Sequence, residues 1–287
     1  MSLGFFLGLA SGVFFGIMSY LVYAGAGRIP SAELAFMRAT FSFVALTPFI
    51  TAHVRKAFSA RSGTLWLRSV AGAISMQCYF WNLQNSNVGT ANTFANLAPV
   101  FVALLAWWFL RERINRPEAL GIALAVAGAL SINAPWANPP RGLVTAVGVT
   151  GSLSASVSYL ALREAALEFS SPLVVWCLSA ATMLACPFAP GAVWIMPHGS
   201  FWLLIAGVGA AGMMGQVLMT RSFLYVRPQV ASVLALTSLI WGLVLQIVFE
   251  HKIPKAGEWV AYALVLLGVA LLQLTAHSHA VAEAAAE

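Results

Sequence analysis

The 287-residue sequence contains no aspartate, and charged residues make up only 8% of it. A soluble domain carries roughly 25% charged residues, and a chain that is 60% apolar has more apolar surface than a core surrounded by water can bury. The lack of charge therefore excludes an ordinary soluble protein. The net charge of +6 comes from basic residues near the ends of apolar stretches, where they orient a protein in the membrane. It does not indicate a nucleic-acid partner.

Histidine and cysteine are also scarce and poorly placed for chemistry. The five histidines lie in expected loops or in the C-terminal tail, and the three cysteines (Cys78, Cys177 and Cys186) lie inside apolar stretches. These cysteines indicate neither a disulfide framework nor a metal site. Catalysis inside a membrane needs a nucleophile with a base, or carboxylates and metal ligands. We therefore expect the protein not to be an enzyme and to use no metal or cofactor.

Long apolar stretches are what the sequence has in abundance. A helix needs about 20 residues to cross the ~30 Å hydrocarbon core of a bilayer, and short connections link ten such stretches. They run over about 3–23, 32–52, 63–85, 89–110, 117–134, 142–162, 171–190, 200–225, 228–249 and 256–276. We expect an all-α fold: a polytopic membrane protein of ten transmembrane helices surrounded by lipid bilayer.

The second half of the chain repeats the plan of the first. Landmarks recur after 138 to 140 residues, which pairs Gln77 with Gln216, Glu112 with Glu250, and Gly128 with Gly268. We expect one five-helix repeat over 1–138, a second over 139–276, and a cytoplasmic tail over 277–287. Because five is odd, the second repeat would enter the membrane in the opposite orientation. Such inverted repeats place a substrate site where the halves meet.

Basic residues predict the orientation. With the N-terminus inside, the cytoplasmic loops hold nine of them: Arg55, Lys56, Arg61, Arg111, Arg113, Arg116, Arg163, Arg221 and Arg227. The opposite side holds four: Arg28, Arg141, Lys252 and Lys255. The positive-inside rule therefore places both termini in the cytoplasm. We expect a multi-pass protein of the bacterial inner membrane.

A stripe of glycines at four-residue spacing marks one face of the first stretch: Gly4, Gly8, Gly12 and Gly16. In lipid, small residues on one face let a neighbouring backbone approach closely. Shifted by 138, the same positions hold Gly142, Ala146, Thr150 and Ser154, which are all small. We expect both faces to pack closely.

Polar and aromatic side chains inside the apolar stretches are the candidates for substrate binding: Gln77, Tyr79, Phe80, Asn82, Asn96, Ser158, Tyr159, Gln216, Ser238 and Trp241. Polar groups within a bilayer need partners or water. They either join helices or border a hydrated cavity, and the sequence leaves both interpretations open. Gating or structural roles are expected for Arg38, Pro99 and Arg221, with snorkelling as the alternative for Arg38.

The run Pro99-Val100-Phe101, followed by Arg111-Glu112-Arg113 and by Gly121 through Gly128, resembles the EamA-type repeat of the drug/metabolite transporter superfamily. The second copy departs from it, with Thr237 in place of the proline and Glu250-His251-Lys252 in place of the basic cluster. The resemblance covers nearly the whole chain. It implies ten helices, alternating access, and a cavity lined mainly by helices 1–4 and 6–9. Among bacterial members, the chain is most similar to exporters of amino acids, especially aromatic ones.

The sequence thus predicts a secondary transporter that exports small neutral or zwitterionic metabolites, most of all amino acids with aromatic or other apolar side chains. A drug, nucleoside or sugar carrier of the same fold is the alternative. A channel is less favoured, since no ring of charges or filter-like loop is visible. The lack of carboxylates within the membrane disfavours a proton relay. Its partners are a small-molecule substrate and lipid, and either a monomer or a homodimer is compatible with the sequence.

Overall fold

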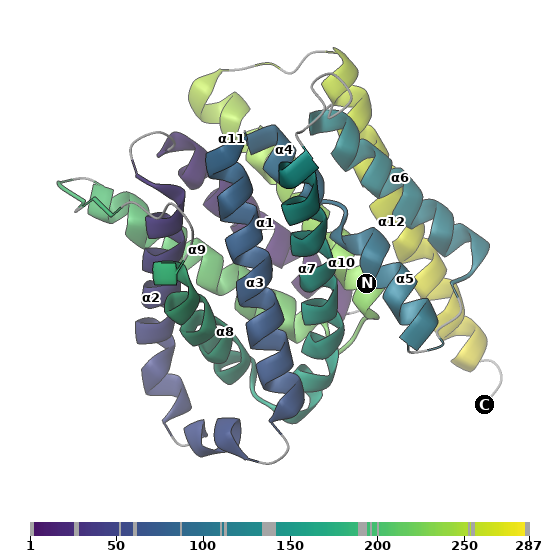
Figure 1. Cartoon of the computed structure of the whole chain (residues 1–287). Coiled ribbons are helices and arrows are strands. Elements are labelled where there is room, and N and C mark those ends of the chain that lie inside the picture. Colours follow the sequence, from purple (N-terminus) through teal and green to yellow (C-terminus); the bar gives the residue numbers. More distant parts are fainter. Residues whose placement is uncertain are drawn as a thin grey trace.

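The computed structural model describes residues 3–25, 29–51, 53–59, 62–86, 88–109, 111, 114–133, 142–188, 194–195, 197–199, 201–251, 253 and 256–284. All regular secondary structure within these residues is helical (Figure 1). The α-helices are α1 (Leu3–Ala24), α2 (Ser31–Ile50), α3 (Gly63–Asn85), α4 (Val88–Ala95), α5 (Ala98–Phe109), α6 (Arg116–Asn133), α7 (Gly142–Glu168), α8 (Ser171–Ala185), α9 (Phe201–Ser222), α10 (Pro228–Leu234), α11 (Ser238–Glu250) and α12 (Ala256–Ala284). The short 3-10 helices are η1 (Val54–Phe58), η2 (Cys186–Phe188) and η3 (Ala235–Thr237).

Many of these helices suit a membrane. Within the described residues, seven helical segments are long and apolar enough to cross one: Leu3–Ala24, Ala32–Ile50, Thr90–Phe109, Gly142–Glu168, Ser171–Phe188, Phe201–Ser222 and Pro228–Glu250. The apolar part of α12 is shorter, and α3 and α6 are more polar than these seven. The prediction of an all-α, multi-pass membrane protein is confirmed, whereas the number of ten crossings stays a prediction.

Two helices that the sequence predicts to be continuous are interrupted. The stretch 89–110 is divided into α4 and α5, and the stretch 228–249 into α10, η3 and α11. In the first case the cause is Pro99, which has no N–H and whose ring crowds the carbonyl of Ala95 four residues earlier. Pro99 therefore lies in the first turn of α5 rather than mid-helix. The second interruption contains no proline, and its Thr237 lies against Gly12 of α1.

Equivalent helices in the two halves begin 140 residues apart. This holds for α2 and α8 (31 and 171), α4 and α10 (88 and 228), α5 and α11 (98 and 238), and α6 and α12 (116 and 256). In the described chain, the non-glycine residues with positive φ are Arg111 (φ 53°) and His251 (φ 54°), which are again 140 apart (251 − 111). The sequence offset of 138 or 139 for the earlier helices is therefore wrong. The offset of 140, predicted only for the last helix, holds more widely.

The glycine stripe of α1 packs closely, as predicted. All four glycines are buried. An added Cβ would lie 2.1 to 2.5 Å from a side chain of the segment that joins α9 to α11: Tyr225 at Gly4, Leu234 at Gly8, Thr237 at Gly12 and Trp241 at Gly16. Ordinary carbon–carbon contacts are about 3.5–4.0 Å, so only glycine fits at these positions.

The corresponding face of α7 is not the predicted one. Ala146 and Thr150 are exposed, whereas Gly148 and Ser152 are buried and face α4. A Cβ added at Gly148 would lie 2.2 Å from Phe94 Cδ2, and Ser152 Oγ donates to the carbonyl oxygen of Phe94. The predicted stripe is therefore wrong by two residues.

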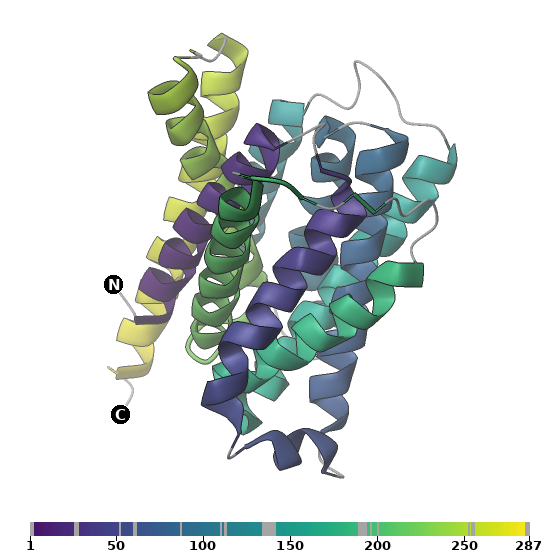
Figure 2. The ribbon, with the colours of Figure 1, turned by 90° about the vertical axis from the view of Figure 1, so that its left-hand side faces the viewer.

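The helix arrangement places the middle of the bundle between the two halves. α3 runs along α7, and α9 runs along α1 in the corresponding way, while α2 packs against both α8 and α9 (Figures 1 and 2). α6 and α12 pack on each other at the side of the bundle (Figure 1). Their contact passes through Gly121, Gly128 and Gly268, each within 3 Å of the opposite helix once a Cβ is added. This leaves α2, α3, α8 and α9 to surround the centre.

Candidate functional site

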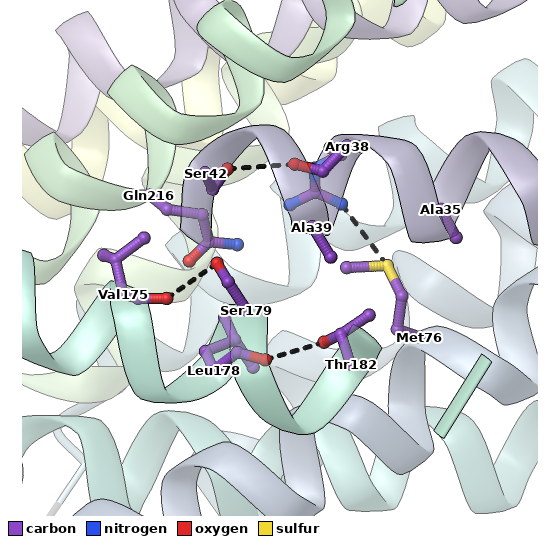
Figure 3. A pocket seen from close by; sticks show the side chains of 10 residues that line it. All are labelled: Ala35, Arg38, Ala39, Ser42, Met76, Val175, Leu178, Ser179, Thr182 and Gln216. Atoms are coloured by element: carbon purple, nitrogen blue, oxygen red, sulfur yellow. Dashed lines mark hydrogen bonds between the residues drawn. The ribbon is translucent and has the colours of Figure 1, made fainter. Parts of the chain in front are cut away.

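A small pocket lies among α2, α3, α8 and α9, with walls from both halves of the chain (Figure 3). Ten residues line it: Ala35, Arg38, Ala39, Ser42, Met76, Val175, Leu178, Ser179, Thr182 and Gln216. The space holds about one water molecule, so a larger solute could enter only if the helices moved apart. None of the ten lining side chains is aromatic.

Arg38 brings a positive charge into this pocket. Its Nη1 donates to Met76 Sδ at 3.4 Å (Figure 3), and a thioether is a weak acceptor. The guanidinium fits beside α9 because position 212 is glycine: a Cβ there would lie 2.6 Å from Arg38 Nε. It also interacts electrostatically with the phenols of Tyr79 and Tyr159.

A second guanidinium, that of Arg68, lies next to the pocket on the α3 side. Arg68 is only 3% exposed. Its Nη1 donates to Ser158 Oγ of α7, and its Nη2 donates to Gln216 Oε1 of α9 at 3.2 Å. Ser158 Oγ donates back to the Arg68 carbonyl oxygen at 2.8 Å. Gly72 makes room for this group, since a Cβ there would lie 2.7 Å from Arg68 Nη1. Arg68 therefore joins the first half of the chain to two helices of the second.

Tyr159 lies between these charges and the core. It interacts electrostatically with both Arg68 and Arg38, and its ring packs against Phe223 with centroids 5.9 Å apart. The phenol thus adds a polar group to the surroundings of the two guanidinium groups.

Three hydroxyl groups give the pocket a second, different character. Ser42 Oγ donates to the Arg38 carbonyl oxygen (3.1 Å), Ser179 Oγ to that of Val175 (2.8 Å), and Thr182 Oγ1 to that of Leu178 (2.8 Å) (Figure 3). Each hydroxyl has a single hydrogen and two lone pairs. Because the hydrogens are used within the helices, the oxygens offer only acceptors to the pocket. One side of the pocket is therefore suited to an anion and another to an ammonium group.

Gln77 does not line the pocket with Gln216, as the sequence had paired them. Its Nε2 donates to Cys186 Sγ at 3.1 Å. The offset of 140 relates Gln216 to Met76 instead (216 − 76), and Met76 does line the pocket. A slip of one residue on a helix turns a side chain by about 100°, which explains why the predicted pair is not formed.

Two aromatic candidates lie behind the pocket wall on α3. Tyr79 donates from its hydroxyl to Asn92 Oδ1 of α4 at 2.8 Å. Phe80 is 6% exposed and packs in a cluster with Ala35 and Cys186. These contacts join α3 to its neighbours.

The two asparagine candidates lie toward α7 and in the helix interruption. Asn82 is 1% exposed, and its amide can donate to Val144 O (3.2 Å) and accept from Gly148 N (3.3 Å). Asn96 lies between α4 and α5, is 9% exposed, and has a buried Nδ2 without a partner. Asn82 thus acts in helix packing.

The remaining candidates belong to other surfaces. Ser238 and Trp241 lie beside Gly16 of α1, and Trp241 is 40% exposed. Arg221 is exposed at the C-terminal end of α9. These three residues are outside the ten that line the pocket.

Sequence reasoning missed Arg68 and Met76. Arg68 comes five residues after the start of α3, so it was taken for a residue of the membrane interface. A charge count carried the missing signal: of 15 Lys and Arg residues, nine and four were assigned to the two sides, which leaves two (15 − 9 − 4), Arg38 and Arg68. Charged residues within a membrane mark functional sites.

Comparison with known proteins gives a consistent result. Residues 2–134 match the EamA-like transporter family. The chain is 27% identical to the pseudopaline exporter CntI of Pseudomonas aeruginosa over 258 residues, which cover 88% of this chain and 89% of the relative. It is 22% identical to solute carrier family 35 member G1 of Mus musculus, over 88% of this chain and 73% of the relative. A solved crystal structure shares the fold, with a TM-score of 0.76 at 18% identity, covering 96% of this chain and 98% of that chain.

Proposed function

We propose, from the premise that residues 2–134 form an EamA-type transporter domain within a multi-pass membrane protein, that this protein is a secondary transporter which exports amino acids and related small zwitterions. The observation that carries the proposal is the pocket between the halves. It combines the Arg38 guanidinium, next to that of Arg68, with hydroxyl oxygens that can only accept hydrogen bonds. A carboxylate suits the first group and an ammonium the second.

The proposed mechanism is alternating access between two inverted five-helix repeats, 1–138 and 139–276, with ten helices that cross the membrane. The recurrence of contacts with the halves exchanged supports it. Gly8 meets Leu234 as Gly148 meets Phe94, and both members differ by 140 (148 − 8 and 234 − 94). In transporters with such repeats, one half rocks against the other around a site near the midplane. The narrow pocket fits a closed state of this cycle.

For the location we propose the bacterial inner membrane with both termini in the cytoplasm. The distribution of basic residues supports this orientation, with nine on the proposed inner side and four on the other. The name of the Pseudomonas aeruginosa relative, an exporter, supports outward transport.

Within the substrate class, the preference for aromatic side chains loses support. The sequence offered Tyr79, Phe80 and Trp241 as stacking surfaces, but none of them lines the pocket. A carrier for drugs, nucleosides or sugars is the alternative function. The two guanidinium groups favour a solute with a carboxylate over those neutral compounds.

Counterflow in proteoliposomes tests the proposal. The purified protein should exchange labelled amino acids, and not nucleosides or sugars, against unlabelled solute. Gln216→Ala removes one bond to Arg68, which is worth about 1.5–3 kcal/mol for a charged partner, and should weaken apparent affinity about tenfold or more. Gln246→Ala on α11, outside the pocket wall, is the matched control and should leave it unchanged. Exchange of sugars or nucleosides alone would refute the amino-acid assignment, and no exchange of any solute would refute the transport function.

A further inference from the structure

The two arginines at the centre are not neutralised by the protein. The hydrogen bonds of Arg38 and Arg68 go to a thioether, a hydroxyl and an amide. Across the described residues, no hydrogen bond or ion pair joins either guanidinium to a carboxylate. Two positive charges therefore lie close enough to interact with each other and share a surrounding of neutral groups.

The buried glutamates nearest in chain order are engaged elsewhere. Glu33, on the same helix as Arg38, accepts a hydrogen bond from Ile195 N at 2.9 Å. Glu118 pairs with Arg227 at 2.6 Å. The sequence has no aspartate. The protein thus lacks the usual means of compensating two inward-facing cations.

Much of the hydrogen-bonding capacity of these cations is also unused. A guanidinium has five N–H donors. Arg38 uses one of them on a weak acceptor, and Arg68 uses two. Arg68 Nε is buried and has no partner. Burying a charge without compensation is costly, so the arrangement makes sense when a solute supplies the missing negative charge.

We propose that the transported solute carries two carboxylates, one for Arg38 and one for Arg68, so that the substrate class is an acidic amino acid or a related diacid with an amine. This inference rests on the proposed transport function and narrows its substrate. A neutral zwitterion has a single carboxylate and leaves one guanidinium without a counter-charge. The hydroxyl oxygens of Ser179 and Thr182 remain available as acceptors for the amine of the solute.

The asymmetry of the site supports a solute with its acidic groups on one side. Under the 140-residue offset, Arg38 corresponds to Leu178 (178 − 38) and Arg68 to Val208 (208 − 68). Leu178 lines the pocket as an apolar side chain, and Val208 is 1% exposed. Both cations therefore come from the first half of the chain.

The test compares diacids with their own monoamides in the full-length purified protein. Glutamate and glutamine have nearly the same shape and differ by one carboxylate, and the unbranched diacids from succinate to pimelate with their monoamides extend the range of length. Binding is followed as ligand-dependent heat stability at constant ionic strength. At least one diacid should bind roughly tenfold or more tightly than its monoamide, since a hydrogen bond to a charged group is lost in the amide.

Substitutions then assign the preference to the two arginines. Arg38→Gln and Arg68→Gln should each bring the ratio of diacid to monoamide affinity close to one, while Arg68→Lys should keep a part of it. Arg55→Gln, at an exposed position of η1, is the matched control and should leave the ratio unchanged.

The inference is overturned if every diacid binds no better than its monoamide in the unaltered protein, a result that needs no variant to fold. It is also overturned if the preference survives both glutamine substitutions. Counterflow of neutral amino acids that both variants support equally well would leave the transport function standing and remove the two-carboxylate substrate alone.

Discussion

The register of α7 leads to a sharp prediction about Gly148 and Gly142. Both are glycines of one helix, and the same change to alanine gives both up to about 1 kcal/mol of helix propensity. At Gly148 the new Cβ would lie 2.2 Å from Cδ2 and 2.3 Å from Cγ of Phe94, a ring that is 7% exposed. At Gly142 it would meet nothing within 4 Å.

The clash sets the expected difference between the two variants. A contact of about 3.5 Å or more is needed between carbons, so the Phe94 ring or the whole of α4 must move by more than 1 Å. Overpacking of this kind costs about 1–3 kcal/mol. At about 2–4 °C per kcal/mol for a chain of comparable size, Gly148→Ala should melt roughly 2–12 °C below Gly142→Ala.

Thermal unfolding in detergent, followed by intrinsic fluorescence, measures this difference, and transport by each variant provides a second readout. The 138-residue offset places Gly142 on the packing face and makes the opposite prediction. A loss of stability in Gly142→Ala equal to or greater than that in Gly148→Ala would refute the 140-residue register and with it the correspondence of Met76 with Gln216.

Three further outcomes follow from the described contacts. Glu118→Gln breaks the pair with Arg227 and should lower stability by about 1–3 kcal/mol, less than for a fully buried pair because Arg227 is 36% exposed; an unchanged melting temperature would contradict this. Tyr79→Phe removes one hydrogen bond between α3 and α4 and should cost about 0.5–1.5 kcal/mol, measured by the same melting, with transport retained. A cysteine at Gly199 should react with an impermeant thiol reagent in intact cells and one at Ser59 should not; labelling of Ser59 would reverse the proposed orientation.

The fold was largely accessible from the sequence because lipid imposes a simple rule. Helix length and apolarity decide which segments cross the membrane, and the helix boundaries of the structure follow the apolar stretches closely. The glycine stripe of α1 was equally legible, since close approach of two helices in lipid favours small residues. The interruption at Pro99 was visible as a proline, but its effect on the helix was underestimated.

The register of the repeat and the composition of the site were not accessible in the same way. Matching polar landmarks aligned Gln77 with Gln216, whereas the packed contacts align Met76 with Gln216. Two divergent halves keep their backbone contacts while their polar residues change, so polar identity is a poor guide to register. The bonds of Arg68 reach Ser158 and Gln216, 90 and 148 positions away, and no local pattern reveals pairings of that length.

The asymmetry of the site suggests how a solute could drive the conformational cycle. The guanidinium groups of Arg38 and Arg68 belong to the first half, and the acceptor oxygens of Ser179 and Thr182 belong to the second. On the proposed mechanism, a solute that binds its carboxylates to one half and its amine to the other is held fully only when the halves close on it. A ligand shifts an equilibrium between states only by its difference in affinity for them. Here that difference arises because two dissimilar halves, built on one helix plan, each supply one part of the binding site.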